Sequence, residues 1–399
     1  MADSNIVEHT RWWATMAVLA AGVVSAFQIG KLPASLPALR DDLDFGLVVA
    51  GWVISTISVV GVLTGMASGW ISDRIGHRRT LLFGMAIMAI GTLAGACSWN
   101  GASLITTRFV EGIGYIAVIT TAPSLLATVS SPNDRSMVMG VWSFYLPFGL
   151  SGMVVASPLL LGLVSWRGLW LANGVIIVLA LAMVATAIRP SRVPCSGPKV
   201  SAWPAIRDTL SSPHSYALAV CFGSYSLIHL AVVAFLPTFL IEGRGIAPLD
   251  AALMTALAMF MNAPGCLLGG WLLRLGGPAW LVAGAGHAGM LLCSLGIYPD
   301  HFSGELRYLL AATLPFLGGL IPPAILAHAP LHATSSAMVA TTIGLIMQFL
   351  SLGQLLGPPL LAVLVAGTGT WSRATDLTVS SAVVGLIAAV MLWWLDRQR

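Results

Sequence analysis

Long apolar runs, repeated along the whole chain, constrain this sequence more than any other feature. Each run is long enough for a helix to cross a bilayer, which takes about 20 apolar residues. Strands of a membrane β-barrel would be about half as long and would alternate in polarity, so the runs are predicted to be helices. The twelve predicted spans are residues 13–37, 47–71, 79–99, 101–126, 136–161, 168–188, 214–240, 248–273, 277–297, 306–329, 335–361 and 374–395.

Charged residues are too scarce for a water-soluble fold. Asp, Glu, Lys and Arg make up 9% of the 399 residues, whereas an ordinary soluble domain has about 25%. This excludes a soluble globular protein, a disordered chain and an enzyme anchored by a single span. The net charge of +4 is too small to indicate a nucleic-acid partner, and the five cysteines lack the spacing of a metal site. We expect a protein of the lipid bilayer, with no metal and no nucleic acid.

The distribution of Lys and Arg predicts the orientation. With the N-terminus in the cytoplasm, twelve of the 19 basic residues fall in cytoplasmic segments and five in outer loops. The other two, Lys31 and Arg108, lie inside spans. We therefore expect a multi-pass protein of the plasma membrane, the inner membrane in a bacterium, with both termini in the cytoplasm.

A polar, proline-rich stretch divides the chain. Residues 189–213 contain five prolines and four basic residues and are predicted to be a cytoplasmic linker. Six spans precede it in residues 1–188 and six follow it in residues 214–399. A shift of 200 residues places Pro37 on Pro237 and Arg74 on Arg274, which favours an internal duplication. The predicted fold class is an all-α polytopic membrane protein with 12 transmembrane helices in two six-helix halves.

The loop after the second span reads G-W-I-S-D-R-I-G-H-R-R from Gly69 to Arg79. It resembles the signature loop of the major facilitator superfamily, G-x-x-x-D-R-x-G-R-[KR]-[KR], with His77 in place of the first basic residue. Gly69 lets two helices approach closely, and Asp73 can pair with an Arg or a helix N-terminus. The alternative is that the basic cluster only sets topology. The predicted conformational latch consists of Gly69, Asp73, Arg74, Gly76, Arg78 and Arg79.

Further motifs extend the resemblance along the chain. Arg108 to Gly112 resembles the R-x-x-x-G motif of the superfamily, and the G-x-W-x-x-Y-x-P-x-G pattern that begins at Gly140 is similar to its cyanate and nitroimidazole permease-like branch. The resemblance is weaker in the second half, where Leu273 replaces the acidic residue of the repeated loop. It implies the major facilitator fold, in which two halves rock about a central site, and a monomeric protein.

Nucleotide chemistry is not expected. Gly284 to Gly289 fits G-x-G-x-x-G, but it lies within an apolar helix rather than after a strand, so helix packing explains it better. No ATPase motif is present. We therefore predict no cofactor and no enzymatic activity.

Polar and aromatic side chains within the spans mark a candidate path for substrate and protons. The resemblance implies that spans 1, 4, 7 and 10, and the facing parts of spans 2, 5, 8 and 11, line a central cavity. The predicted path residues on these spans are Gln28, Lys31, Arg108, Glu111, Tyr115, Trp142, Tyr145, Tyr225, His229, Asn262, Gln348 and Gln354.

The charges within the spans suggest the cargo. Lys31 and Arg108 are balanced by Glu111 alone, and this positive excess favours an anionic solute. We expect a secondary active transporter of a small anionic solute, coupled to protons through Glu111, with His229 assisting. Three alternatives stay open: Lys31 extends to the outer surface, Arg108 and Glu111 form a structural pair, and His229 is a packing residue.

Other functions are compatible with a polytopic membrane protein. The main alternative is a proton-driven efflux pump for drugs or metabolites, which would use the same fold. A membrane-embedded enzyme and a non-transporting sensor are less favoured, because the sequence shows no catalytic pair and no signalling domain.

Overall fold

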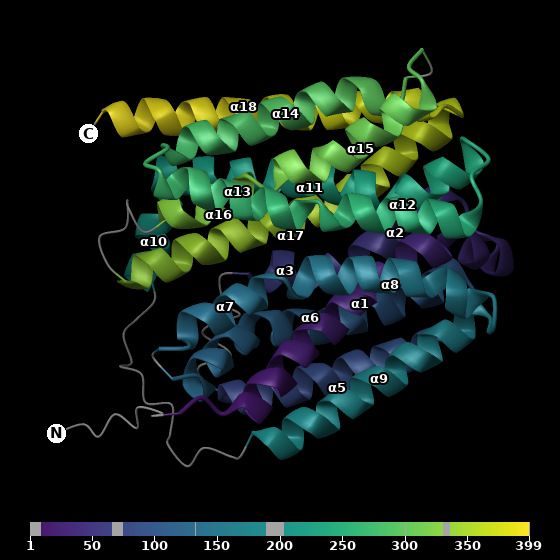
Figure 1. Cartoon of the computed structure of the whole chain (residues 1–399), viewed down its shortest axis with the longest axis horizontal. Helices are drawn as coiled ribbons and strands as arrows, with labels where there is room; N and C mark the ends of the chain where they lie inside the picture. Colours follow the sequence, from purple (N-terminus) through teal and green to yellow (C-terminus); the bar gives the residue numbers. More distant parts are fainter. Residues whose placement is uncertain are drawn as a thin grey trace.

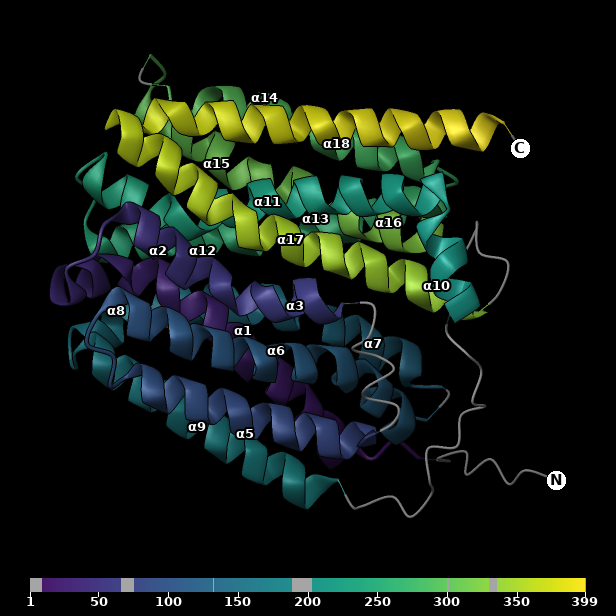
Figure 2. The ribbon, with the colours of Figure 1, turned by 180° about the vertical axis from the view of Figure 1, so that it is seen from behind.

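The computed structural model describes residues 9–65, 75–131, 133–188, 203–299, 301–329 and 336–398, and every regular element in these ranges is a helix. The helices run roughly side by side in two blocks (Figure 1). Both termini lie at the same end of the bundle, which we call the terminal end (Figures 1 and 2). We call the opposite end, where α1 finishes, the distal end.

The first block is built from the N-terminal part of the chain. Its elements are α1 (Trp12–Leu43), α2 (Leu47–Ser55), the 3-10 turn η1 (Thr56–Ser58), α3 (Val59–Thr64), α5 (His77–Gly95), α6 (Gly101–Val129), α7 (Arg135–Ser143), α8 (Tyr145–Leu161) and α9 (Trp166–Ala187).

The second block is built from the C-terminal part of the chain, and its first helix, α10, falls inside the segment predicted to be the linker. Its elements are α10 (Trp203–Leu210), α11 (Pro213–Glu242), α12 (Pro248–Phe260), α13 (Asn262–Arg274), α14 (Ala279–Ile297), α15 (Gly304–Gly318), α16 (Ile321–His328), α17 (Ser336–Thr368), the 3-10 turn η3 (Trp371–Arg373) and α18 (Ala374–Arg397).

The described helices account for the predicted spans. Eleven helical segments are long and apolar enough to cross a membrane, when α2 to α3, α7 to α8, α12 to α13 and α15 to α16 each count as one. The span predicted at 79–99 corresponds to α5, which is outside this group. Its 19 residues begin with His77, Arg78 and Arg79, so its first turn is polar. It nevertheless packs along α6 and α9 inside the first block.

The two blocks repeat one packing scheme. In the first block, α1 packs on α8 and α9, and α5 packs on α6 and α9. In the second block, α11 packs on α17 and α18, and α14 packs on α15 and α18. These are the equivalent spans of each half, which confirms the predicted all-helical fold of two halves. Residues 189–202 are outside the described residues, so the exact domain limits stay a prediction.

The halves meet along α17. In Figure 2, α2 and α3 lie against α17, and further contacts join α8 to α12 and α1 to α11. Small residues allow this close approach. A Cβ added to Gly51 on α2 would lie 2.8 Å from Cα of Pro359 on α17, and one added to Gly65 would lie 2.8 Å from Cβ of Gln348. The seam between the halves therefore depends on glycine.

Half of the predicted latch can be described. Gly69, Asp73 and Arg74 lie outside the described residues. Gly76 has φ +94° and precedes α5, a conformation that favours glycine. The Arg78 Nε and Nη2 atoms donate to the carbonyls of Ile188 and Ala185, at 2.6 and 3.0 Å. Arg78 therefore ties α5 to the end of α9 within one half, while Arg79 is exposed. The latch as a whole stays a prediction.

Candidate functional site

Three charged side chains form a cluster inside the first half. Lys31 on α1, and Arg108 and Glu111 on α6, have no exposure to solvent. The Nζ atom of Lys31 lies 2.8 Å from Oε1 of Glu111, and Nη1 of Arg108 donates to Oε2 of the same carboxylate. One carboxylate is thus shared by two cations. With all three groups ionised, the cluster carries one net positive charge.

Neutral groups of α1 itself and of two further helices, α2 and α5, hold the cluster in place. The side-chain oxygen of Gln28 accepts hydrogen bonds from Lys31 Nζ at 2.8 Å and from Thr92 Oγ1 on α5 at 3.0 Å. Arg108 donates to the carbonyl of Gln28 at 2.8 Å and to the carbonyl of Val53 on α2 at 3.1 Å. The cluster therefore joins α1, α2, α5 and α6. Buried charges need this degree of pairing, because the desolvation cost of an unpaired charge is several kcal/mol.

The start of α6 fixes the position of Arg108 and Glu111 along the bundle. Asn100 precedes the helix and accepts a hydrogen bond from the Ser103 backbone N–H, while the Ser103 hydroxyl bonds back toward Asn100. This capping box satisfies the backbone N–H groups of Asn100 and Ser103 at the start of the helix. Arg108 and Glu111 then follow, three residues apart and on the same face.

The Lys31 side chain does not extend to the outer surface, so this alternative reading of its sequence position is wrong. Its ammonium lies 4.5 Å from the centre of the Trp170 ring on α9, a cation–π contact in addition to the ion pair. Trp170 itself has no exposure to solvent. The position of Lys31 is thus set by contacts inside the first half.

Two buried donors in the same region lack an acceptor among the described residues. They are Nη2 of Arg108 and Nε1 of Trp170. A buried N–H without a partner is destabilising by about 1–3 kcal/mol, so such groups are rare in folded proteins. Both can take an additional acceptor. The cluster therefore combines a positive charge excess with free donor capacity.

Three aromatic side chains form a second group of predicted path residues. Tyr115 belongs to α6, and Trp142 and Tyr145 belong to the fifth span. Tyr115 lies one turn beyond Glu111, and its phenol is within hydrogen-bonding reach of Tyr145. Trp142 stacks on Tyr145 with ring centres 4.3 Å apart. The Trp142 ring also covers Gly22 on α1, where a side chain would collide with it.

A third group of predicted path residues, Asn262, Tyr225 and His229, lies in the second half. Asn262, at the break between α12 and α13, donates to the Tyr225 hydroxyl and to the Pro315 carbonyl, both at 3.0 Å. The Tyr225 ring centre lies 5.4 Å from that of His229 on the same helix. His229 is half-buried, and its Nδ1 atom has no partner among the described residues.

The two predicted glutamines of α17 form part of the seam between the halves. Ser58 Oγ donates to Oε1 of Gln354 at 3.0 Å, and Nε2 of Gln348 donates to the Val62 carbonyl at 2.5 Å. The predicted path residues thus form four groups rather than one. The sequence interpretation missed Thr92 and Trp170, for which the only signals were a hydroxyl and an indole inside apolar runs.

The polar contacts differ between the two ends of the bundle. At the distal end, Arg40 on α1 and Glu242 on α11 form an ion pair across the halves, with 2.6 Å between Nη1 and Oε1. At the terminal end, Asp134 accepts from Thr10 within the first half, and His328 lies 3.3 Å from Asp396 within the second. Among the described residues, the distal end thus has a direct ion pair between the halves.

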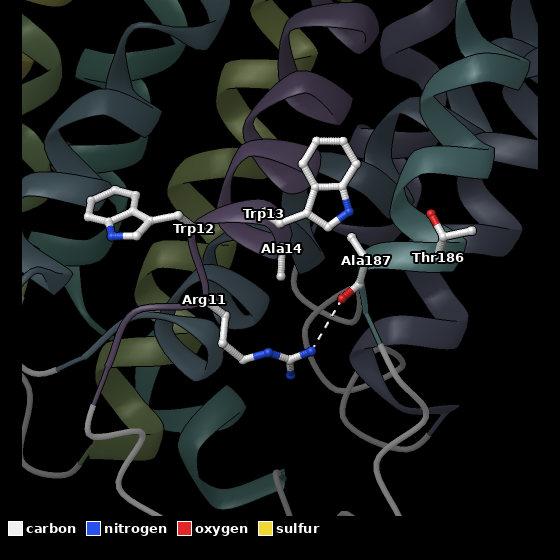
Figure 3. Close-up of a pocket in the computed structure, with 6 residues that line it drawn as sticks. All are labelled: Arg11, Trp12, Trp13, Ala14, Thr186 and Ala187. Carbon is white, nitrogen blue, oxygen red and sulfur yellow. Dashed lines mark hydrogen bonds between the residues drawn. The ribbon is translucent and has the colours of Figure 1, made fainter.

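Two surface pockets lie away from the charged cluster. One, of about 620 Å³, lies between the start of α1 and the end of α9 (Figure 3). The other, of about 680 Å³, is lined by Arg244, Glu305 and Tyr308, among other residues of the second half. Across the described ranges, no group of three or more His, Cys, Asp or Glu residues could hold a metal ion.

The comparisons with known proteins decide the family. The sequence profile of the Major Facilitator Superfamily matches residues 18–358. The chain belongs to the Major Facilitator Superfamily. It resembles the 3-(3-hydroxy-phenyl)propionate transporter of Escherichia coli (strain K12), with 26% identity over 94% of this chain and 88% of that protein. This superfamily member is therefore a multi-pass membrane transporter and not an enzyme.

Other relatives of this superfamily chain match over shorter lengths. The Lincomycin resistance protein of Streptomyces lincolnensis is 28% identical over 49% of this chain and 41% of its own length. The Galactose-proton symporter of Escherichia coli (strain K12) is 24% identical over 41% of this chain and 35% of its own length. The chain thus spans less than half of these two relatives. The cyanate and nitroimidazole permease-like branch stays a prediction.

The fold of the superfamily is also found among solved structures. A bacterial homologue of the human lysosomal transporter Spinster, in an inward-facing and unoccupied conformation, superposes with a TM-score of 0.78 at 15% sequence identity. The match covers 97% of both chains. At this identity the likeness establishes the fold alone.

Proposed function

We propose that this superfamily member is a proton-coupled secondary transporter that moves a small organic anion by alternating access. The observation that carries the proposal is the fully buried cluster of Lys31, Arg108 and Glu111, with its net positive charge. Charged groups inside a membrane bundle are costly and usually mark ion or substrate pathways. The two halves would move about the seam of α2 and α3 with α17.

Glu111 is the proposed proton site. While ionised, it neutralises one of the two cations that it contacts. When it takes up a proton, Lys31 and Arg108 lose that counter-charge in a poorly solvated site. An anionic group of the substrate can then replace the carboxylate at Arg108, whose Nη2 has no other acceptor among the described residues. Protonation thus favours substrate binding, which is the linkage that proton-coupled uptake requires.

Aromatic side chains support an organic anion as the substrate. Tyr115 lies one turn from Glu111 on α6, within hydrogen-bonding reach of Tyr145, and Trp142 stacks on Tyr145. The relative that matches over most of this chain is named for transport of 3-(3-hydroxy-phenyl)propionate, an aromatic carboxylate. A ring that packs on these side chains and a carboxylate that reaches Arg108 would use both features.

The second candidate function is proton-driven efflux of drugs or metabolites. Its support comes from relatives named for lincomycin resistance and for tetracenomycin C resistance and export, which are 28% and 26% identical over about half of this chain. Transport measured in vesicles of both orientations separates the two candidates. Export of a neutral or cationic drug, without uptake of an aromatic carboxylate, would favour efflux.

The proposed coupling can be tested in proteoliposomes. Uptake of radiolabelled 3-(3-hydroxyphenyl)propionate is measured with and without an imposed proton gradient, for the wild type, Glu111→Gln and Glu305→Gln. Glu305 is an exposed carboxylate at the start of α15 and serves as the matched control. We expect the gradient to accelerate uptake by the wild type and by Glu305→Gln only. Equal acceleration in Glu111→Gln would show that Glu111 is not the proton site.

The proposal also includes the location, the oligomeric state and the latch predicted from the sequence. They are a plasma-membrane location with both termini in the cytoplasm, a monomeric protein, and a latch formed by the loop from Gly69 to Arg79. The positive-inside distribution of Lys and Arg supports the orientation. Thiol labelling of single cysteines at the two ends of the bundle, in sealed vesicles, tests it.

A further inference from the structure

We infer that the pocket between α1 and α9 at the terminal end binds the headgroup of an anionic phospholipid. The pocket has a volume of about 620 Å³ and is lined by Arg11, Trp12, Trp13, Ala14, Thr186 and Ala187. Figure 3 shows the two indoles on opposite sides of the chain, with the Arg11 guanidinium below them. The pocket lining therefore combines a cation and two amphipathic rings where α1 begins its apolar run.

Arg11 supplies the charge. Its side chain is exposed, and among the described residues it makes one hydrogen bond, from Nη2 to the Ala187 carbonyl at 3.3 Å, at the end of α9 (Figure 3). A guanidinium has five N–H donors, so donors remain for the oxygens of a phosphate. Phosphate oxygens make the strong, charge-assisted type of bond with such a group.

The tryptophans place this charge at the boundary of the bilayer. Trp12 and Trp13 are 48% and 63% exposed, and Met16, one turn further along α1, is 57% exposed. Trp is enriched where headgroups meet acyl chains, because its ring is apolar and its N–H is polar. On the neighbouring helix α9, Leu179 is also largely exposed. Apolar surface for an acyl chain thus extends from the pocket along both helices.

The surrounding charge favours an anionic lipid over a zwitterionic one. Arg78 bonds to the last carbonyls of α9, and Arg79 is exposed beside it, so two more cations lie at this end. The carboxylate of Asp134, at the same end, is already bonded to Thr10 and Ser131. A choline headgroup would add a further positive charge here, whereas phosphatidylglycerol adds only its phosphate.

The pocket is distinct from the proposed transport site. Arg11 precedes Lys31 by 20 residues of one helix, which is about 30 Å at 1.5 Å per residue. Loss of the lipid site and loss of proton coupling can therefore be measured separately.

The test uses the full chain, purified in detergent and stripped of lipid. Native mass spectrometry counts phosphatidylglycerol and phosphatidylcholine bound to the wild type, Arg11→Gln and Arg135→Gln. Arg135 is the matched control, because it is also exposed at the terminal end and bonded to one carbonyl, that of Ala127. We expect Arg11→Gln to weaken phosphatidylglycerol binding about fivefold, the factor for one basic group near an anionic headgroup, and Arg135→Gln to leave it unchanged.

Further arms distinguish the lipid from a free anion. Arg11→Lys keeps the charge and is expected to retain most of the phosphatidylglycerol binding, which separates loss of the site from loss of the fold. Inorganic phosphate at millimolar concentration is not expected to displace the lipid. Equal binding of the two lipids, an equal loss in both Gln variants, or full displacement by phosphate would each overturn the inference.

Discussion

The Lys31 ammonium on α1 lies 2.8 Å from Oε1 of Glu111 on α6, and neither side chain has any exposure to solvent. Arg108 contacts the other oxygen of the same carboxylate. The charge balance of this buried cluster therefore depends on one acidic residue that contacts two basic ones. Removing the acid and removing a base have different consequences.

Glu111→Gln is expected to destabilise the protein more than Lys31→Met. The first change leaves two buried cations without a counter-charge, whereas the second leaves the balanced pair of Arg108 and Glu111. Removing one partner of a buried ion pair costs about 3–5 kcal/mol. Thermal unfolding in detergent, followed by tryptophan fluorescence, shows which of the two variants is less stable. A lower midpoint for Lys31→Met than for Glu111→Gln would contradict it.

The Arg40–Glu242 pair is expected to stabilise closure of the distal end. The pair joins the halves but is partly exposed, so we expect it to contribute only about 0–1 kcal/mol. A cysteine-free chain with Leu36→Cys reports opening, because Leu36 is fully buried one turn before Arg40. Glu242→Arg should raise the rate of maleimide labelling, and the swap Arg40→Glu with Glu242→Arg should restore the slow rate. Unchanged labelling in Glu242→Arg would exclude this role.

Gly51→Ala is expected to separate α2 from α17. An added Cβ would lie 2.8 Å from Cα and 2.9 Å from N of Pro359, and these backbone atoms cannot rotate away. Gly46 is the matched control, since an added Cβ there meets nothing within 4 Å. The Leu36→Cys reporter should label faster in Gly51→Ala and at the original rate in Gly46→Ala. Identical rates in the two variants would show that the seam tolerates the methyl group.

Acid should weaken the contact between the N-terminal segment and α7. Hydrogen bonds from Thr10 and then Ser131 hold the pKa of Asp134 below its usual range. Such a group stabilises the folded state above the unfolded pKa, near 3.9, and the contribution is lost as pH falls through the lower folded pKa. Thr10→Val should therefore lower the thermal midpoint at pH 6 and have less effect at pH 3. Thr10→Ser, which keeps a hydroxyl, should behave as the wild type.

The fold could be predicted from the sequence because each span carries its own signal. Apolar length and the linker composition are local properties, and the packing of α1 on α8 and of α11 on α17 then follows the internal repeat. The break between α12 and α13 also has a local signal, because Pro264 has no N–H to donate to the Phe260 carbonyl. The contacts that Asn262 makes at this break, with Tyr225 and Pro315, could not be predicted, because these residues are distant in sequence.

The candidate site could be predicted only in part. The sequence identifies three candidates, Lys31, Arg108 and Glu111, because charged residues are rare within apolar spans. Their arrangement could not be predicted, because the direction of the Lys31 side chain depends on Gln28, Thr92 and Trp170, which belong to three helices. Gln348 and Gln354 were predicted to line the path, but a sequence does not reveal that their amides meet α3 and η1 across the seam.

The proline pair in α17 has a mechanical consequence. Pro358 and Pro359 lie inside this 33-residue helix at the level where Gly51 touches it. Neither proline has an N–H, so the carbonyls of Gln354 and Leu355 lose the donors that a regular helix would provide. Bending resistance is therefore lower there than in the turns on either side. The contact of α17 with α2 thus lies beside a compliant joint, where the distal segment of α17 can tilt with α2 while the rest of the helix stays packed on α11.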